Sequence, residues 1–247
     1  MRRSTPGLLL VLTAAFVLAA DGPTFEVVSI RPGAVPSRDD LLLVGIRGGP
    51  GTDDAGRITG RWVAVLNLLT RAYGVQNFQL LNAPDFVFDI NADRYDIVAK
   101  VPPRATPEQV NMMFQNLLIE RFGMVAHHET KTEVFYELTV AKGGPKFKEA
   151  EDPSAAPSFA HGRTLAVSSA PLSVLVPNLE NILRRVVVDK TGLAGKYDFS
   201  VLLPFPGAGA DALRAALQQD LGLTLVEQKG PVDHVVIDHL DKSPTPN

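Results

Sequence analysis

The chain has 247 residues, of which 45% are hydrophobic, and carries a formal net charge of −3 at pH 7. A mildly acidic chain of mixed charge lacks the basic stripe that nucleic acids require, so we expect no nucleic-acid partner. Cysteine is absent, which excludes disulfide bonds and thiolate chemistry, and the length suffices for one large domain or two small ones.

Residues 1–20 are predicted to be a secretory signal peptide. Arg2 and Arg3 precede an apolar run of about signal-peptide length, which is too short for a stable membrane span. Small residues before Asp21 offer a cleavage site, and an uncleaved N-terminal anchor is the alternative. We therefore expect a periplasmic or secreted protein without a membrane span after cleavage.

Residues 21–55 are predicted to form an N-terminal strand and a loop. The strand reads FEVVSIRP at 25–32, and its frame of aromatic, acid, apolar residues and a closing proline recurs at 95–102 and 197–204. Alternation that ends in proline is typical of a strand whose last residue donates no ladder hydrogen bond. We expect the first copy to be an extra strand that pairs with one of the sheets, followed by a second strand at LLLVGI.

Two longer stretches repeat the same order of features. Residues 56–145 read GRITGRWVAVLNLLTRAYGV, RYDIVAKVP and NLLIERFGMVAHHETKTEV. Residues 162–242 read GRTLAVSSAPLSVLVPNLENIL, KYDFSVLLP and ALQQDLGLTLVEQKGPV. A period of about 100 residues is too long for a solenoid unit, so it indicates two copies of a small α/β domain.

Within each copy the pattern predicts a strand, a helix, a strand, a second helix and a closing hairpin. In the first copy, Thr106 and Gln109 form a capping box for the second helix, and Gly74 and Gly123 end the two helices. In the second copy, Pro177 should kink or split the first helix. Residues 146–161 are predicted to be a linker and 243–247 a frayed tail. The fold class is α+β, with two tandem copies of a small sheet whose helices pack on one face.

The Asp189-Lys-Thr-Gly segment matches the phosphorylated-aspartate motif of P-type ATPases. The motif requires a further threonine, where this chain has Leu193, and additional aspartates to hold Mg²⁺, which no matching segment supplies. We interpret the segment as a turn in which the Asp189 side chain binds its own backbone.

Metal motifs are incomplete throughout the sequence. His128-Glu129 lacks the second histidine of a zinc protease, since position 132 is threonine. His234 and His239 lie five residues apart on a strand, and hence on opposite faces, so we interpret the histidines as satisfied or solvent-facing. The calcium-like run that begins at Asp89 has Arg94 where glycine is required. We predict no metal, no cofactor and no catalytic residue.

The segments FEVVSIRP, LLTRAYGV, RYDIVAK, LLIERFGM, ELTVAKGGPK, VVVDKTGLAGKYDF and KGPVDHVVIDH together resemble a soil-associated, acidobacteria-type family of exported proteins of unknown function. The second repeat, through LAVSSAPLSVL and ALRAALQQDLGLTLVEQ, also resembles the secretin/TonB short N-terminal domain, a periplasmic interaction module. The resemblance implies export, and some members of the family carry a domain of this kind behind a membrane-bound BlaR1-type peptidase. It transfers no catalytic residues.

We expect an exported, non-catalytic binding or protein-interaction protein, with an envelope protein or peptide as its partner. Exposed sheet edges and the groove between the repeats suit a peptide. Ordinary core packing is the alternative for the aromatic members of the candidate contact residues, which are Trp62, Tyr73, Phe86, Phe88 and Asp189. The alternative functions are an envelope hydrolase using carboxylates such as Asp189 and Asp198, and a sensor domain for a membrane peptidase.

Overall fold

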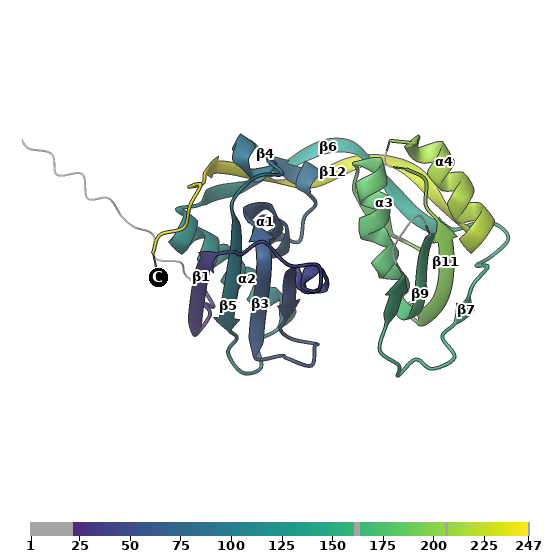
Figure 1. The fold of residues 1–247 in the computed structure, drawn as a ribbon. Helices are drawn as coiled ribbons and strands as arrows, with labels where there is room; N and C mark the ends of the chain where they lie inside the picture. Colours follow the sequence, from purple (N-terminus) through teal and green to yellow (C-terminus); the bar gives the residue numbers. More distant parts are fainter. Residues whose placement is uncertain (1–21, 161–163, 206, 247) are drawn as a thin grey trace, which may run out of the picture.

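The computed structural model describes residues 22–160, 164–205 and 207–246, so the predicted signal peptide lies outside the described residues. Within these ranges the chain forms three four-stranded sheets and four α-helices, in two halves bridged by two long strands (Figure 1). The predicted α+β class is confirmed. None of the described helices has the length and apolar character that a membrane crossing requires.

The first half contains an antiparallel sheet with helices on one face. Its strand order is β1-β5-β3-β2, built from β1 (Val27–Pro32), β2 (Gly45–Gly48), β3 (Arg57–Ala64) and β5 (Arg94–Lys100). The helices α1 (Val65–Tyr73) and α2 (Pro107–Phe122) lie behind this sheet (Figure 1). Alternate strand residues such as Ile58 and Ile97 form a buried core with Leu68 and Phe114 of the helices.

The second half repeats this plan. Its strand order is β7-β11-β9-β8, from β7 (Lys148–Glu149), β8 (Ser158–Ala160), β9 (Thr164–Pro171) and β11 (Lys196–Leu202). The helices are α3 (Val176–Leu183) and α4 (Gly209–Ala216), the latter continued by a π-helical turn at Leu217–Leu221. Residues 146–161, which we expected to be a linker, contain β7 and β8 at the two edges of this sheet.

Several local predictions are confirmed in the helices. Gln109 N–H donates to Thr106 Oγ1 at 3.2 Å and Thr106 N–H donates to Gln109 Oε1 at 2.9 Å, which completes the predicted capping box. Pro177 stands in the first turn of α3, directly after a short 3₁₀ segment at Leu172–Leu175, so the proline splits the segment as expected. Further 3₁₀ turns occur at Leu41–Leu43 (η1), Asn77–Gln79 (η2) and Asp85–Val87 (η3). The LLLVGI stretch, which we expected to be one strand, therefore begins as a 3₁₀ turn before β2.

The third sheet joins the halves through two continuous strands, β6 (Val125–Val140) and β12 (Leu223–His239). The two predicted hairpins are wrong: each is a single strand, and the two strands pair with one another along their length. Two short parallel strands complete the order β10-β6-β12-β4, namely β4 (Leu80–Leu81) and β10 (Val187–Asp189).

The long strands exchange partners between the halves. Leu138, near the end of β6, is buried in the core of the second half, whereas Ile237, near the end of β12, is buried in the core of the first half. The ladder is symmetric about the Thr132–Pro231 pair, because equivalent positions of the two strands lie at equal distances on either side of it. Each core is thus completed by the last strand of the other repeat.

The described part of the C-terminal tail, up to Pro246, is bonded to the end of α2 at Thr245. The Asp241 N–H donates to the Phe122 carbonyl at 2.8 Å, and the Thr245 N–H donates to the Arg121 carbonyl at 2.7 Å. Arg121 in turn donates from its guanidinium to the Thr245 carbonyl. The prediction of a frayed tail rested on the general mobility of chain termini and did not include these contacts with the end of α2.

Candidate functional site

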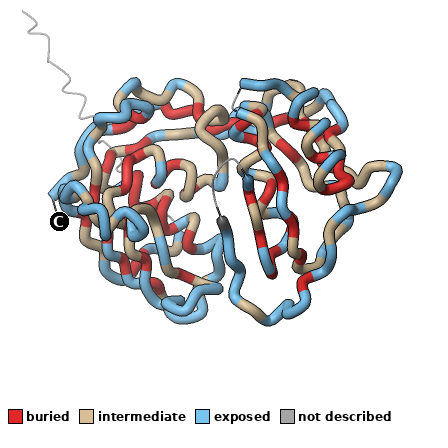
Figure 2. Tube along the Cα trace, turned by 45° about the vertical axis from the view of Figure 1, so that its right-hand side comes forward, coloured by how far each residue is buried: buried red, intermediate tan, exposed pale blue. Residues whose placement is uncertain are grey.

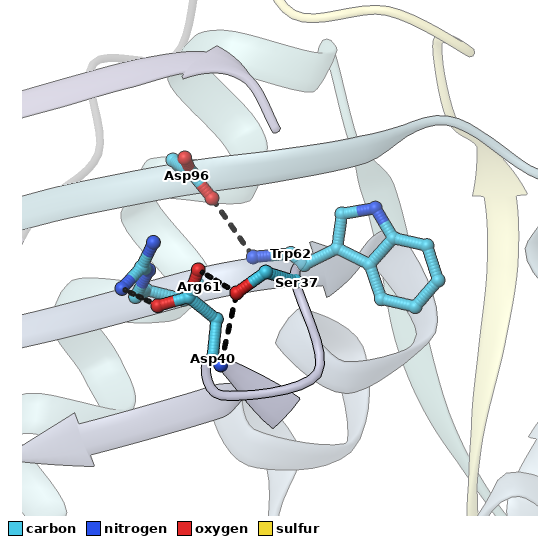
Figure 3. Close-up of polar contacts among 5 residues, drawn as sticks. All are labelled: Ser37, Asp40, Arg61, Trp62 and Asp96. Atoms are coloured by element: carbon cyan, nitrogen blue, oxygen red, sulfur yellow. Dashed lines mark hydrogen bonds and ion pairs between the residues drawn. The ribbon is translucent and has the colours of Figure 1, made fainter. Parts of the chain in front are cut away.

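Trp62 occupies a strained position in a β-bulge. Its φ is 51°, and its backbone N–H donates to Asp96 Oδ1 at 2.8 Å (Figure 3). The Arg94 guanidinium lies 5.4 Å from the centroid of the indole ring, at a distance suited to a cation–π contact. Trp62 is therefore half-buried and held by its own sheet.

The second half contains the same bulge. Ser169 has a φ of 52°, and its N–H donates to Asp198 Oδ1 at 2.8 Å. Asp198 is therefore the structural counterpart of Asp96, and its carboxylate compensates a backbone donor that the bulge removes from the ladder. We assign Asp198 this structural role.

The loop that leads to β2 is tied to β3 by a polar cluster (Figure 3). Ser37 Oγ donates to Asp40 Oδ2 at 2.8 Å, and Arg61 Nη1 lies 3.3 Å from Asp40 Oδ1. The Ser37 hydrogen bond, together with the Arg61 charge, lowers the pKa of Asp40 below its ordinary value. The loop therefore holds the apolar turn η1 next to the sheet.

The other predicted contact residues do not form one site. Tyr73 and Phe86 both pack against the first core, and burial raises the pKa of Tyr73. Phe88 is exposed to 49%. Asp189 Oδ1 accepts hydrogen bonds from the Thr191 N–H at 2.9 Å and the Thr191 hydroxyl at 2.7 Å, which is the expected turn.

A groove of about 490 Å³ lies between the halves. Most of its wall comes from β2, α1 and the segment after α1, and Asn181 contributes from α3 of the second half. The three asparagines that line it, Asn67, Asn77 and Asn181, have side-chain amide N–H groups without a hydrogen-bond partner among the described residues. Its volume falls within the range of about 300–1,000 Å³ that is typical of ligand sites.

Side chains from both halves fix the inner end of this groove. Gln76 Nε2 donates to Glu180 Oε2 at 2.9 Å, and Arg184 Nη1 donates to Asn77 Oδ1 at 2.8 Å. The other oxygen of Glu180 accepts from the Val187 N–H at 3.1 Å. Burial raises the pKa of Glu180, while these hydrogen bonds oppose that shift.

An apolar turn stands beside the groove. The residues of η1, Leu41, Leu42 and Leu43, are exposed to 57%, 82% and 40%. Gly45, two residues after Leu43, lines the groove itself. Three consecutive exposed leucines on a surface turn are unusual for a region without a binding role.

Acidic and histidine side chains do not converge. Within the described ranges, no group of three or more histidines and carboxylates is arranged to hold a metal ion. His234 corrects the expectation of satisfied or solvent-facing histidines, since it is buried and its ring nitrogens lack a hydrogen-bond partner among the described residues. Its Nε2 lies 3.5 Å from Glu133 Oε1.

Sequence comparison places the chain in a family. Residues 66–240 match the model of the DUF3738 family, described as a protein of unknown function, and the chain belongs to this family. The match begins inside α1 and extends to the end of β12. No curated protein and no solved structure matches the chain.

Proposed function

We propose that the protein is an exported, non-catalytic binding protein that holds a segment of an envelope protein in the groove between its two halves. The observation that carries the proposal is the groove itself, with free amide groups along its wall and exposed leucines beside it.

The chemistry of the groove suits a polypeptide backbone. Amide N–H groups of Asn67, Asn77 and Asn181 can donate to peptide carbonyls, and η1 offers apolar contact to a side chain of the same segment. The resemblance of the second repeat to a periplasmic interaction module supports a protein partner. The carboxylates of Asp189 and Asp198 are each engaged by donors of their own turn or bulge, so they offer no support for a hydrolase.

A capture experiment tests this function. The mature chain is immobilised beside two variants, Leu42→Asp in η1 and Ile90→Asp in the loop after η3, and exposed to envelope extract. The two positions are matched controls because their side chains are exposed to 82% and 84%. We expect one defined protein to be retained by the wild type and by Ile90→Asp, and to be lost with Leu42→Asp. Equal retention by all three chains would contradict a partner in the groove.

A further inference from the structure

The sheet of the first half has one face that none of the described α-helices covers, and the loop before β2 contacts this face where Asp40 pairs with Arg61. Strand residues alternate between the helix-packed face and this open face, so the register places a defined set of side chains together. The cationic members of the open face come from all four strands: Arg31, Arg47, Arg57, Arg61, Arg94 and Lys100.

Three of these cations form no ion pair in the described part of the chain, although Asp96 lies opposite Arg31 in the strand register. Arg31, Arg47 and Arg57 are exposed and form neither an ion pair nor a side-chain hydrogen bond there. Two acids beside these cations are already engaged. Lys100 pairs with Glu26 at 2.5 Å, and Asp96 accepts the Trp62 N–H. The open face is therefore positively charged on a chain that is acidic as a whole.

A shallow apolar hollow of about 330 Å³ lies among these cations. Val27 and Val98 line it and are exposed to 66% and 42%, and Arg57 and Lys100 stand at its sides. The hollow can therefore bind an apolar side chain, with the Arg57 guanidinium and the Lys100 ammonium group next to it.

The equivalent face of the second half differs at the two cations that flank the hollow. Arg57 pairs with Lys100 across β3 and β5, and the corresponding pair across β9 and β11 is Thr164 with Leu202. The scaffold therefore does not require Arg57 and Lys100, since the corresponding strands of the second half form without cations at these two positions.

We propose that the open face of the first sheet is a second docking surface, which binds an acidic polypeptide segment with an apolar side chain among its carboxylates. The apolar side chain occupies the hollow between Val27 and Val98, and flanking carboxylates pair with Arg57 and Arg47. Guanidinium groups suit carboxylates because they can donate two parallel hydrogen bonds.

Other classes of ligand fit this face less well. A glycan or a nucleic-acid base stacks on an open aromatic ring, and Trp62, the aromatic residue of this face, already has the Arg94 guanidinium over its ring. Insertion into a bilayer needs apolar side chains that project from the surface, whereas Val27 and Val98 line a hollow.

The test uses the fluorescence of Trp62, the only tryptophan of the chain. The probe is a synthetic peptide of aspartates around a central leucine. Its controls are the same peptide with asparagine for aspartate, the same peptide with glycine for leucine, and vesicles of one part phosphatidylglycerol to three parts phosphatidylcholine. We expect saturable binding of the acidic leucine peptide that weakens as salt rises.

Variants separate this surface from the groove. Arg57→Glu should weaken binding at least about tenfold, because it places like charges together. Lys148→Glu on the open face of the second sheet is the matched control and should change the affinity less than about twofold. Leu42→Asp should leave peptide binding unchanged, so failure of the groove proposal and failure of this one are distinguishable. Equal binding of the asparagine peptide, an unaffected Arg57→Glu variant, or binding to vesicles alone would overturn the proposal.

Discussion

The two halves share a scaffold and differ in the side chains that the scaffold presents. Both contain a bulge whose N–H is bound by an aspartate, at Trp62 and at Ser169. Both have a long strand that completes the core of the other half. On the open faces, however, the pair Arg57 and Lys100 in the first half corresponds to Thr164 and Leu202 in the second. The repeat therefore preserves the fold, whereas the exposed side chains of the open faces differ between the halves.

Burial along the chain differs between the two cores and the ribbon that joins them. Buried segments alternate with exposed ones along the strands of both halves (Figure 2). The central part of the β6–β12 ribbon is polar and largely exposed or half-buried, for example at Glu129, Lys131 and Glu133. Each half therefore has its own hydrophobic core, and the central part of the ribbon between the cores is accessible to solvent.

The largest expected effect tests the exchange of strands. Leu138→Ala in β6 and Ile237→Ala in β12 each remove a buried side chain and should cost about 2–5 kcal/mol of unfolding free energy. Hydrogen exchange should show lost protection in α3 and α4 for Leu138→Ala, although Leu138 belongs to the first repeat. Ile237→Ala should instead affect α1 and α2. Loss of protection within the same repeat as the substitution would refute the exchange.

The second prediction compares glycines at the ends of two equivalent helical segments, α2 and the π-helical turn after α4. Gly123 and Gly222 have φ values of 56° and 65°, and alanine in the left-handed region costs about 1–2 kcal/mol. A Cβ at position 222 would also meet the Gly144 carbonyl oxygen at 2.1 Å, whereas at position 123 it would meet the movable Asp241 carboxylate at 2.6 Å. Denaturant unfolding should therefore show Gly222→Ala to be the more destabilising variant. Equal losses of unfolding free energy would contradict this, because the Gly144 backbone would then have moved to make room for the new Cβ.

A third prediction concerns the two bulges. Asp96→Ala and Asp198→Ala each leave a backbone N–H without its acceptor and should destabilise by about 1–3 kcal/mol. Because the geometry is the same in both halves, the two losses in thermal or urea unfolding should be similar. A large loss at one site with none at the other would show that the bulges are not equivalent.

The smallest effect is a dependence on pH at the contact between the halves. Burial raises the pKa of Glu180 above its ordinary value of 4.5, so the folded protein binds more protons than the unfolded chain just above that pH. The contribution of Glu180 to the free energy of unfolding therefore falls as pH rises from the pKa of the unfolded state to the higher pKa of the folded state. Urea unfolding at several pH values should show Glu180→Gln gaining stability relative to the wild type as pH rises from about 4.5. A constant difference would mean that Glu180 has the same pKa in both states.

Local sequence patterns predicted much of the fold. The capping box at Thr106, the split at Pro177 and the turn at Asp189 all follow from residues within a few positions of one another. The repeat itself predicted the α+β class and the presence of two similar units.

Local sequence patterns did not predict the pairing of strands that lie far apart in the chain, such as β6 with β12. The recurring Glu-x-Lys segments at Glu129–Lys131 and Glu227–Lys229 were interpreted as two hairpin turns. In the structure they lie in the part of the ribbon between the two cores, where a strand can carry charges on its exposed surface. The open-face arginines were missed for a related reason: alternation at Arg57, Thr59 and Arg61 was visible, but the face that the helices leave open was not.

The most direct test of the central claim transfers the second half's residues into the first. The double variant Arg57→Thr and Lys100→Leu reproduces the pair found at Thr164 and Leu202. Its affinity for the acidic leucine peptide is measured by Trp62 fluorescence beside its melting temperature. The account predicts that binding is lost while the melting temperature stays close to that of the wild type. Retained binding by a folded variant would contradict it.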